Sequence, residues 1–218
     1  MIDAEEPCNI EAMTTVFLLS PAHCAGRRAT MLVRRGATHQ MAARLEAGTL
    51  SLGEAFAFMS GLYFRGKLAY AQAFGRRSGD DPAVLVITPT RGLQRPDHIV
   101  TRALIEEFAS TDVSDAEPRY RDPLVADARR LADGLSCEAR VVLLGSVATT
   151  KYVEVLSEAF ADSLCFPADF VGRGDMSRGA LLLRSASAGT ELPYVAVSSA
   201  PSRHGPRPPR ISPRGSRR

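Results

Sequence analysis

Three short apolar runs along the chain predict the strands of a buried sheet. They cover residues 14–20, 83–88 and 139–144, and none contains an acidic residue. Continuous apolar runs of this length are typical of strands that are covered on both faces, as in a parallel sheet. Pro21 and Pro89 end the first two runs, and the turn Gly145-Ser146 ends the third.

Apolar residues that recur with helical spacing predict helices between these strands. The expected helices cover residues 39–46, 52–74, 98–110, 124–134 and 150–162. Arg65-Gly66-Lys67 interrupts the second helix, and Asp97 suits the N-cap of the third. Because strands and helices alternate, the pattern indicates an α/β fold with a mostly parallel central sheet flanked by helices.

The last apolar segments predict a different arrangement at the C-terminal end. A short strand-like piece covers residues 165–170, and two further apolar runs cover 180–185 and 192–197. A turn of small residues separates the last two runs, which is typical of a hairpin. We therefore expect an antiparallel edge at the C-terminal end of the sheet.

Composition indicates one globular unit with two unlike ends. The chain has 218 residues, of which 45% are hydrophobic, so it can bury the core of a single domain. We expect a flexible N-terminus at residues 1–12, one α/β domain at 13–197 and a disordered Arg/Pro-rich tail at 198–218. The acidic start is unlike a signal peptide, and no apolar run reaches the roughly 20 residues of a membrane helix. A cytoplasmic location without a membrane partner is expected.

Charge is distributed unevenly between the tail and the rest of the chain. The last twenty residues supply six arginines and no acid, so the net charge of +3 becomes −3 for the remainder. A flexible basic arm can add salt-dependent affinity for nucleic acid. An extension without a role is the alternative.

Cysteine and histidine positions indicate neither a metal nor a disulfide framework. The four cysteines are far apart with no C-x-x-C pair, and the four histidines lack the spacing of a helical metal pair. The P-loop and the G-x-G-x-x-G pattern are absent as well. We therefore expect no metal and no cofactor.

The segment Gly172-Arg173-Gly174-Asp175-Met176-Ser177-Arg178-Gly179 is the densest cluster of candidate binding residues. Its glycines allow a close backbone approach, and its arginines can bind an oxyanion. The turn at Gly145-Ser146, between a strand and a helix N-terminus, is a second place that favours an anion. His23 and Asp175 are weak candidates for a catalytic proton transfer.

The order of motifs resembles the peroxide-stress family called YaaA. The resemblance spans about residues 14–184. The motifs that carry it are Ser20-Pro21-Ala22, residues 64–70, the loop 90–97, residues 145–152 and the run 172–178. His23 departs from it, since the family has a lysine there, and the loop before Pro96 is shorter.

The resemblance implies a cytoplasmic protein with a basic cleft that binds or protects DNA under oxidative stress. Carried over by position, it implies an anion-binding or nucleic-acid-binding set of eight residues. These are Ser20, Lys67, Tyr70, Ser146, Tyr152, Arg173, Ser177 and Arg178. Each has a structural alternative: the arginines can form surface ion pairs, the tyrosines can belong to the core, and the serines can cap strand or helix ends.

Two functions therefore remain open. The first is a DNA-binding protein that uses loop arginines on phosphates. The arginines concerned are Arg27, Arg28, Arg91, Arg95, Arg173 and Arg178. The second is an enzyme acting on a nucleotide, nucleoside or sugar phosphate, in which Asp175 or His23 moves a proton. The motifs favour the first function narrowly.

Overall fold

The computed structural model describes residues 14–77, 81–147 and 150–200. The predicted flexible N-terminus lies outside these residues, as does the predicted disordered tail from residue 201 onward. No helix in the described part of the chain is long and apolar enough to cross a membrane.

A six-stranded sheet forms the centre of the molecule, with the strand order β3-β2-β1-β4-β5-β6. Four strands run parallel: β1 (Thr15–Leu19), β2 (Val84–Ile87), β4 (Arg140–Leu144) and β5 (Leu164–Pro167). The edge strands β3 (Leu93–Gln94) and β6 (Tyr194–Ala196) run antiparallel to their neighbours. Every residue of β1 is buried, as a central parallel strand requires. The predicted α/β fold with an antiparallel C-terminal edge is thus confirmed.

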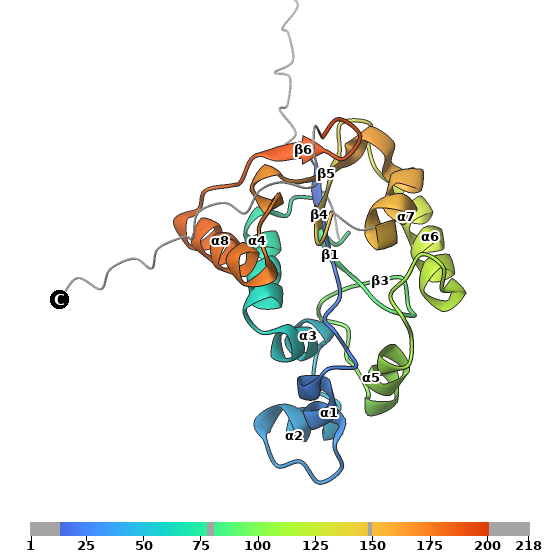
Figure 1. Ribbon diagram of the computed structural model, residues 1–218, viewed down its shortest axis with the longest axis vertical. Helices are drawn as coiled ribbons and strands as arrows, with labels where there is room; N and C mark the ends of the chain where they lie inside the picture. Colours follow the sequence, from blue (N-terminus) through green and yellow to red (C-terminus); the bar gives the residue numbers. More distant parts are fainter. Residues whose placement is uncertain (1–13, 78–80, 148–149, 201–218) are drawn as a thin grey trace, which may run out of the picture.

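Helices cover both faces of this sheet. In Figure 1, α4 (Leu62–Phe74) and α8 (Asp175–Ala188) lie on one side, while α6 (Pro118–Asp133) and α7 (Thr150–Phe160) lie on the other. Four further helices lie toward one end of the molecule, with α1 and α2 outermost. They are α1 (Arg27–Val33), α2 (Gln40–Glu46), α3 (Leu52–Ser60) and α5 (Arg102–Ala109). Two short 3-10 turns, Ala161–Ser163 and Ala168–Phe170, flank β5.

The long helix expected at residues 52–74 is broken at a different place from the one predicted. The break lies at Gly61, whose φ of 63° is left-handed, so α3 and α4 are separate helices. Gly66 instead lies inside α4, where α8 crosses it. A Cβ on Gly66 would stand 2.6 Å from the carbonyl oxygen of Gly179, and one on Gly179 would stand 2.8 Å from that of Leu62. The two helices therefore pack backbone against backbone, and the crossing leaves no room for a Cβ at either glycine.

Four local predictions were wrong. Residues 180–185 belong to α8 and not to a hairpin strand, so β6 pairs with β5 instead. The leucine run that suggested a strand is the face of a helix, of which Leu182 is fully buried. Thr101, not Asp97, caps α5, and Asp97 instead pairs with Arg95 at 2.8 Å. Finally, the basic loop after β2 contains the short strand β3, and α1 begins within the expected loop after β1.

Candidate functional site

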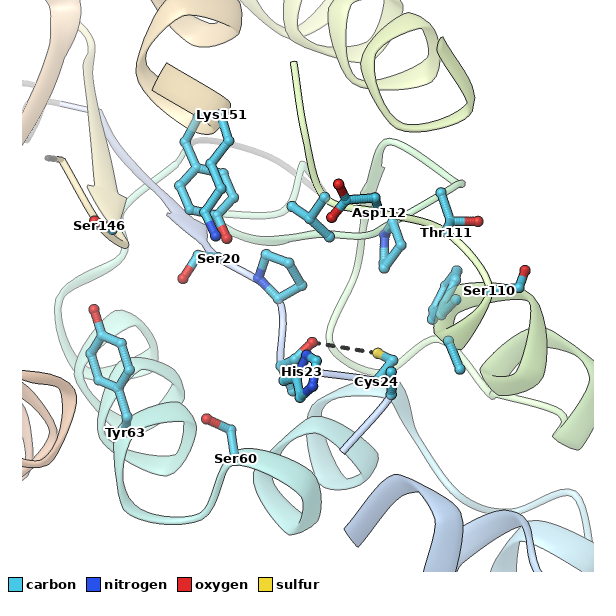
Figure 2. Close-up of a pocket in the computed structure, with 18 of the residues that line it drawn as sticks. Ser20, His23, Cys24, Ser60, Tyr63, Ser110, Thr111, Asp112, Ser146 and Lys151 are labelled. Carbon is cyan, nitrogen blue, oxygen red and sulfur yellow. Dashed lines mark hydrogen bonds between the residues drawn. The ribbon is translucent and has the colours of Figure 1, made fainter. Parts of the chain in front are cut away.

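A pocket of about 540 Å³ opens at the carboxyl ends of β1 and β4 (Figure 2). Its wall is built from the segment after β1, Ser146 after β4, the α3–α4 junction, the end of α5 with the loop that follows, and the first turns of α7 and α8. In open parallel sheets, ligands bind at this end of the strands. Ser20 after β1 and Ser146 after β4 line the same pocket, because these two parallel strands are neighbours in the sheet.

Ser20 stands directly after β1 and is 5% exposed. Its backbone N–H donates to the carbonyl oxygen of Leu144 at 3.1 Å, which continues the pairing of β1 with β4. A Cβ on Gly145 would lie 3.0 Å from the Ser20 Cβ, so a glycine at this turn makes room for the serine. The sheet therefore fixes the position of the Ser20 hydroxyl at the pocket wall.

Lys67 of α4 lies behind Ser20 and is 1% exposed. Its Nζ donates to the Ser20 carbonyl oxygen at 2.5 Å and to Ser20 Oγ at 2.9 Å. The rings of Tyr63 and Phe64 pack on the same amine, with centroids at 4.6 and 4.8 Å. Burial lowers the pKa of Lys67 to about 7, and nearby Asp175 offsets only part of that effect. A large share of Lys67 is therefore a neutral amine near pH 7.

Two tyrosines complete the inner end of the pocket. Burial raises the pKa of Tyr152, and an interaction with the Ser20 side chain lowers it in part. Tyr63 is 7% exposed, and burial raises its pKa to about 12. Its hydroxyl oxygen is buried, and an interaction with the Arg178 side chain offsets part of the rise in pKa. Figure 2 shows this hydroxyl on the side of the pocket where Ser20 and Ser146 lie.

Lys151 enters the pocket from the first turn of α7 and was not among the predicted site residues. Its Nζ lies 5.0 Å from the centroid of the Tyr152 ring, and Figure 2 shows the side chain reaching toward Ser20. Lys67 and Lys151 are the two lysines in a chain that has 27 lysines and arginines together. Lys67 thus bonds Ser20, and Lys151 lines the pocket that Ser20 also lines. The scarcity of lysine is visible in the sequence and could have indicated Lys151 as a candidate site residue.

Several predicted residues lie elsewhere. Tyr70 is buried away from the pocket lining, where its hydroxyl bonds that of Tyr194 at 2.7 Å. Arg178 is 8% exposed and donates to the carbonyl oxygen of Phe170 at 3.0 and 3.2 Å. Arg173 donates to the carbonyl oxygen of Asp169 and to Ser177 Oγ at 2.8 and 3.3 Å. Arg173, Ser177 and Arg178 thus organise the turn before α8 and do not line the pocket.

The loop arginines do not form one common cleft. Arg91 pairs with Glu107 at 2.7 Å, and Arg95 pairs with Asp97. Arg27 and Arg28 begin α1, and neither lines the pocket.

Both candidates for proton transfer, His23 and Asp175, do line the pocket, and both are exposed. Cys24 beside them is buried, and its thiol donates to the carbonyl oxygen of Ala22 at 3.4 Å. Burial raises the pKa of Cys24 to about 12, so the thiol stays protonated at neutral pH.

Among residues 14–77, 81–147 and 150–200, no three His, Cys, Asp or Glu side chains gather as a metal site.

No family model, curated protein or solved structure matches the chain. The resemblance to YaaA therefore stays a prediction, and the function has to be argued from the chemistry of the pocket.

Proposed function

We propose that the protein is an enzyme that hydrolyses or transfers an acyl group, with Ser20 as the nucleophile and Lys67 as its general base. The observation that carries this proposal is the buried pair of Ser20 Oγ and Lys67 Nζ, 2.9 Å apart, at the wall of a pocket. A serine hydroxyl is a weak nucleophile until a neighbouring base accepts its proton. A lysine with a pKa of about 7 can be that base at neutral pH.

The first half of the reaction uses groups that are already in contact. Ser20 Oγ forms a bond to the substrate carbonyl carbon while its proton passes to Lys67 Nζ. The carbonyl oxygen becomes an oxyanion, to which the hydroxyl of Tyr63, at the same pocket wall, donates a hydrogen bond. When the bond to the leaving group breaks, that group takes the proton from Lys67, and the acyl group stays on Ser20.

The second half reverses the roles. A water molecule or an acceptor alcohol or amine attacks the acyl carbon and gives its proton to Lys67. The bond to Ser20 Oγ then breaks, and the serine recovers its proton from Lys67. No further oxidant or reductant is needed, because each step moves only a proton and an electron pair.

The nature of the two lysines supports this assignment. Arginine stays protonated in proteins, whereas a buried lysine can lose its proton near pH 7. The chain carries arginine at 25 of its 27 Lys/Arg positions and has lysine only at residues 67 and 151. Lys67 bonds Ser20, and Lys151 lines the same pocket as Ser20. A purely structural role for Lys67 would be to bind the end of β1 through the Ser20 carbonyl oxygen. That role alone would leave Ser20 unreactive.

Labelling by a fluorophosphonate tests the proposal, since an activated serine displaces fluoride from this reagent. We expect one adduct, located by peptide mass analysis on Ser20 and absent in Ser20→Ala. Ser60→Ala and Ser146→Ala, which remove other hydroxyls of the same wall, serve as matched controls and should label normally. The rate should rise as the pH increases through about 7, because the base must be neutral. Absence of label on Ser20 in the folded protein would overturn the proposal.

A second candidate function, association with nucleic acid, is supported by the surface of α1 and α2. No acidic residue lies between Glu11 and Glu46, and five arginines do. Of these, Arg27, Arg34 and Arg35 are exposed, and they form no ion pair with the described residues. Unpaired surface arginines are what phosphate backbones bind. The resemblance to YaaA points the same way, with DNA as the partner.

A further inference from the structure

Lys151 is the one cationic side chain of lysine or arginine type in the described lining of the pocket. It is partly buried, and the packing of its amine on the ring of Tyr152 holds it at the inner end. Figure 2 shows Ser20 with Lys151 on one side and Tyr63 on the other. A cation and a tyrosine hydroxyl thus line the same pocket as the proposed nucleophile.

Lys151 forms no ion pair within the described part of the protein. The lining acids Asp112 and Asp175 come from the loop after α5 and from the start of α8, and neither forms an ion pair with Lys151. Asp112 lies across the pocket in Figure 2. The Tyr63 hydroxyl is buried and interacts with the Arg178 side chain. A cation without an acidic partner at the wall of a pocket is suited to bind an anionic ligand.

We infer that the substrate of this site is an acyl compound that carries an anionic group, a carboxylate or a phosphate, beside the reacting carbonyl. This inference rests on the proposed function of Ser20. The carbonyl oxygen faces Tyr63 while the anionic group binds Lys151, and the pair of contacts orients the carbonyl carbon toward Ser20 Oγ. Lys151 is then the residue that selects charged substrates over neutral ones.

Anion binding can be tested without any reaction. We would titrate the protein with inorganic phosphate and, separately, with succinate, and would use neutral succinamide as the matched control. Calorimetry should detect binding of at least one anion, but not of succinamide, to the wild type and to Ser20→Ala. Lys151→Met should weaken that binding at least tenfold, and Lys151→Arg should retain most of it, because arginine keeps the charge. The preferred anion distinguishes a phosphate substrate from a carboxylate substrate.

Turnover gives the second readout. Acetyl phosphate and neutral p-nitrophenyl acetate are both acyl donors, so the ratio of their kcat/KM values reports the preference for charge. If phosphate is the anion bound, Lys151→Met should lower kcat/KM for acetyl phosphate at least tenfold and leave p-nitrophenyl acetate within about twofold. If succinate alone binds, Lys151→Met should leave kcat/KM unchanged for both acyl donors. The loss of succinate binding in Lys151→Met then supports the inference.

The outcomes separate the two proposals. If Ser20 takes up no fluorophosphonate but the anion still binds in a Lys151-dependent way, the acyl-transfer function fails and the anion site stands. If Ser20 is labelled but neither anion binds, or Lys151→Met binds as well as the wild type, the inference about the substrate is wrong while the proposed function stands.

Discussion

The pocket at the end of β1 and the surface formed by α1 and α2 use basic side chains in opposite ways. At the pocket both basic groups are lysines, and Lys67 is withdrawn from water and in contact with Ser20. On α1 and the turn that follows it the basic groups are arginines, of which Arg27, Arg34 and Arg35 are exposed. A permanent charge in water suits a sequence-independent contact with an anion, whereas a buried amine that can lose its proton suits chemistry. The type of basic residue, and not its number, therefore separates the two regions.

The largest expected difference between these regions is in reactivity. Lys67→Met removes the base and should slow fluorophosphonate labelling of Ser20 by roughly 10³-fold, which corresponds to about 4 kcal/mol. The triple variant Arg27→Ser/Arg34→Ser/Arg35→Ser should label at the wild-type rate. Melting curves would establish that both proteins are folded. Equal labelling rates in Lys67→Met and the wild type would show that Lys67 is structural.

The next largest effect concerns the packing that holds Lys67 in place. Gly179→Ala should lower the free energy of unfolding by about 1–3 kcal/mol, because the new Cβ would overlap the backbone of α4 at Leu62 and Tyr63. Gly134→Ala is the matched control, since a Cβ there meets no atom closer than 3.7 Å. Urea unfolding of the three proteins measures the difference. A Gly179→Ala protein as stable as Gly134→Ala would contradict the close crossing of α4 and α8.

A third prediction concerns the pH dependence of stability. The pKa of Lys67 falls from 10.5, its ordinary value, to about 7 on folding. Between these pH values the unfolded chain binds more protons than the folded protein, so this residue makes the free energy of unfolding rise with pH. The contribution is at most about 1.4 kcal/mol per pH unit. Below pH 7 the cost of burying the amine is fully present, and it is relieved as the pH approaches 10.5.

The difference between the wild type and Lys67→Met isolates this contribution, because other titrating groups are common to both proteins. Urea unfolding at several pH values from about 7.5 to 9.5 should give the wild type the steeper rise. Parallel curves for the two proteins would mean that Lys67 keeps its proton in the folded state.

The smallest expected effects on stability belong to the α1–α2 surface. Replacing Arg27, Arg34 and Arg35 by serine should change the free energy of unfolding by less than about 0.5 kcal/mol each. Duplex DNA affinity, measured by fluorescence anisotropy over a salt series, should fall. The slope of log affinity against log salt concentration should become less steep by about 0.9 for each lost phosphate contact. The matched control replaces the paired arginines 91, 95 and 119, which removes the same charge elsewhere. If both triple variants bind equally well, this surface is not a nucleic-acid site.

The strands of the core were predictable because their sequence pattern is local. Runs of branched and aliphatic residues that end at Pro21, Pro89 and Gly145 are sufficient to place β1, β2 and β4. The run at Leu181–Leu183 gave a wrong strand prediction, because a short apolar run has no periodicity that distinguishes a strand from a buried helix. In the structure these leucines belong to α8, which packs on α4.

The site was predictable in part. Ser20, Ser146 and Tyr152 follow or begin regular elements at one end of the sheet, so the topology brings them together. The role of Lys67 depends on burial against Tyr63 and Phe64, which no local pattern reveals. The arginines at 173 and 178 looked like ligand-binding residues, yet they bind backbone carbonyls of the turn before α8. A dense cluster of charge in sequence can therefore stabilise a turn, while of two isolated lysines one bonds Ser20 and the other lines the pocket.

The protonation state of Lys67 tests the central claim most directly, and the composition makes it measurable. A chain with two lysines, labelled with ¹³C at the lysine side chains, gives two Cε signals, and the one missing in Lys67→Met is that of Lys67. We predict that this signal titrates with a midpoint near pH 7, as a base for Ser20 requires. A midpoint at or above the ordinary lysine value of 10.5 would mean that Lys67 is always charged at neutral pH and would contradict the account.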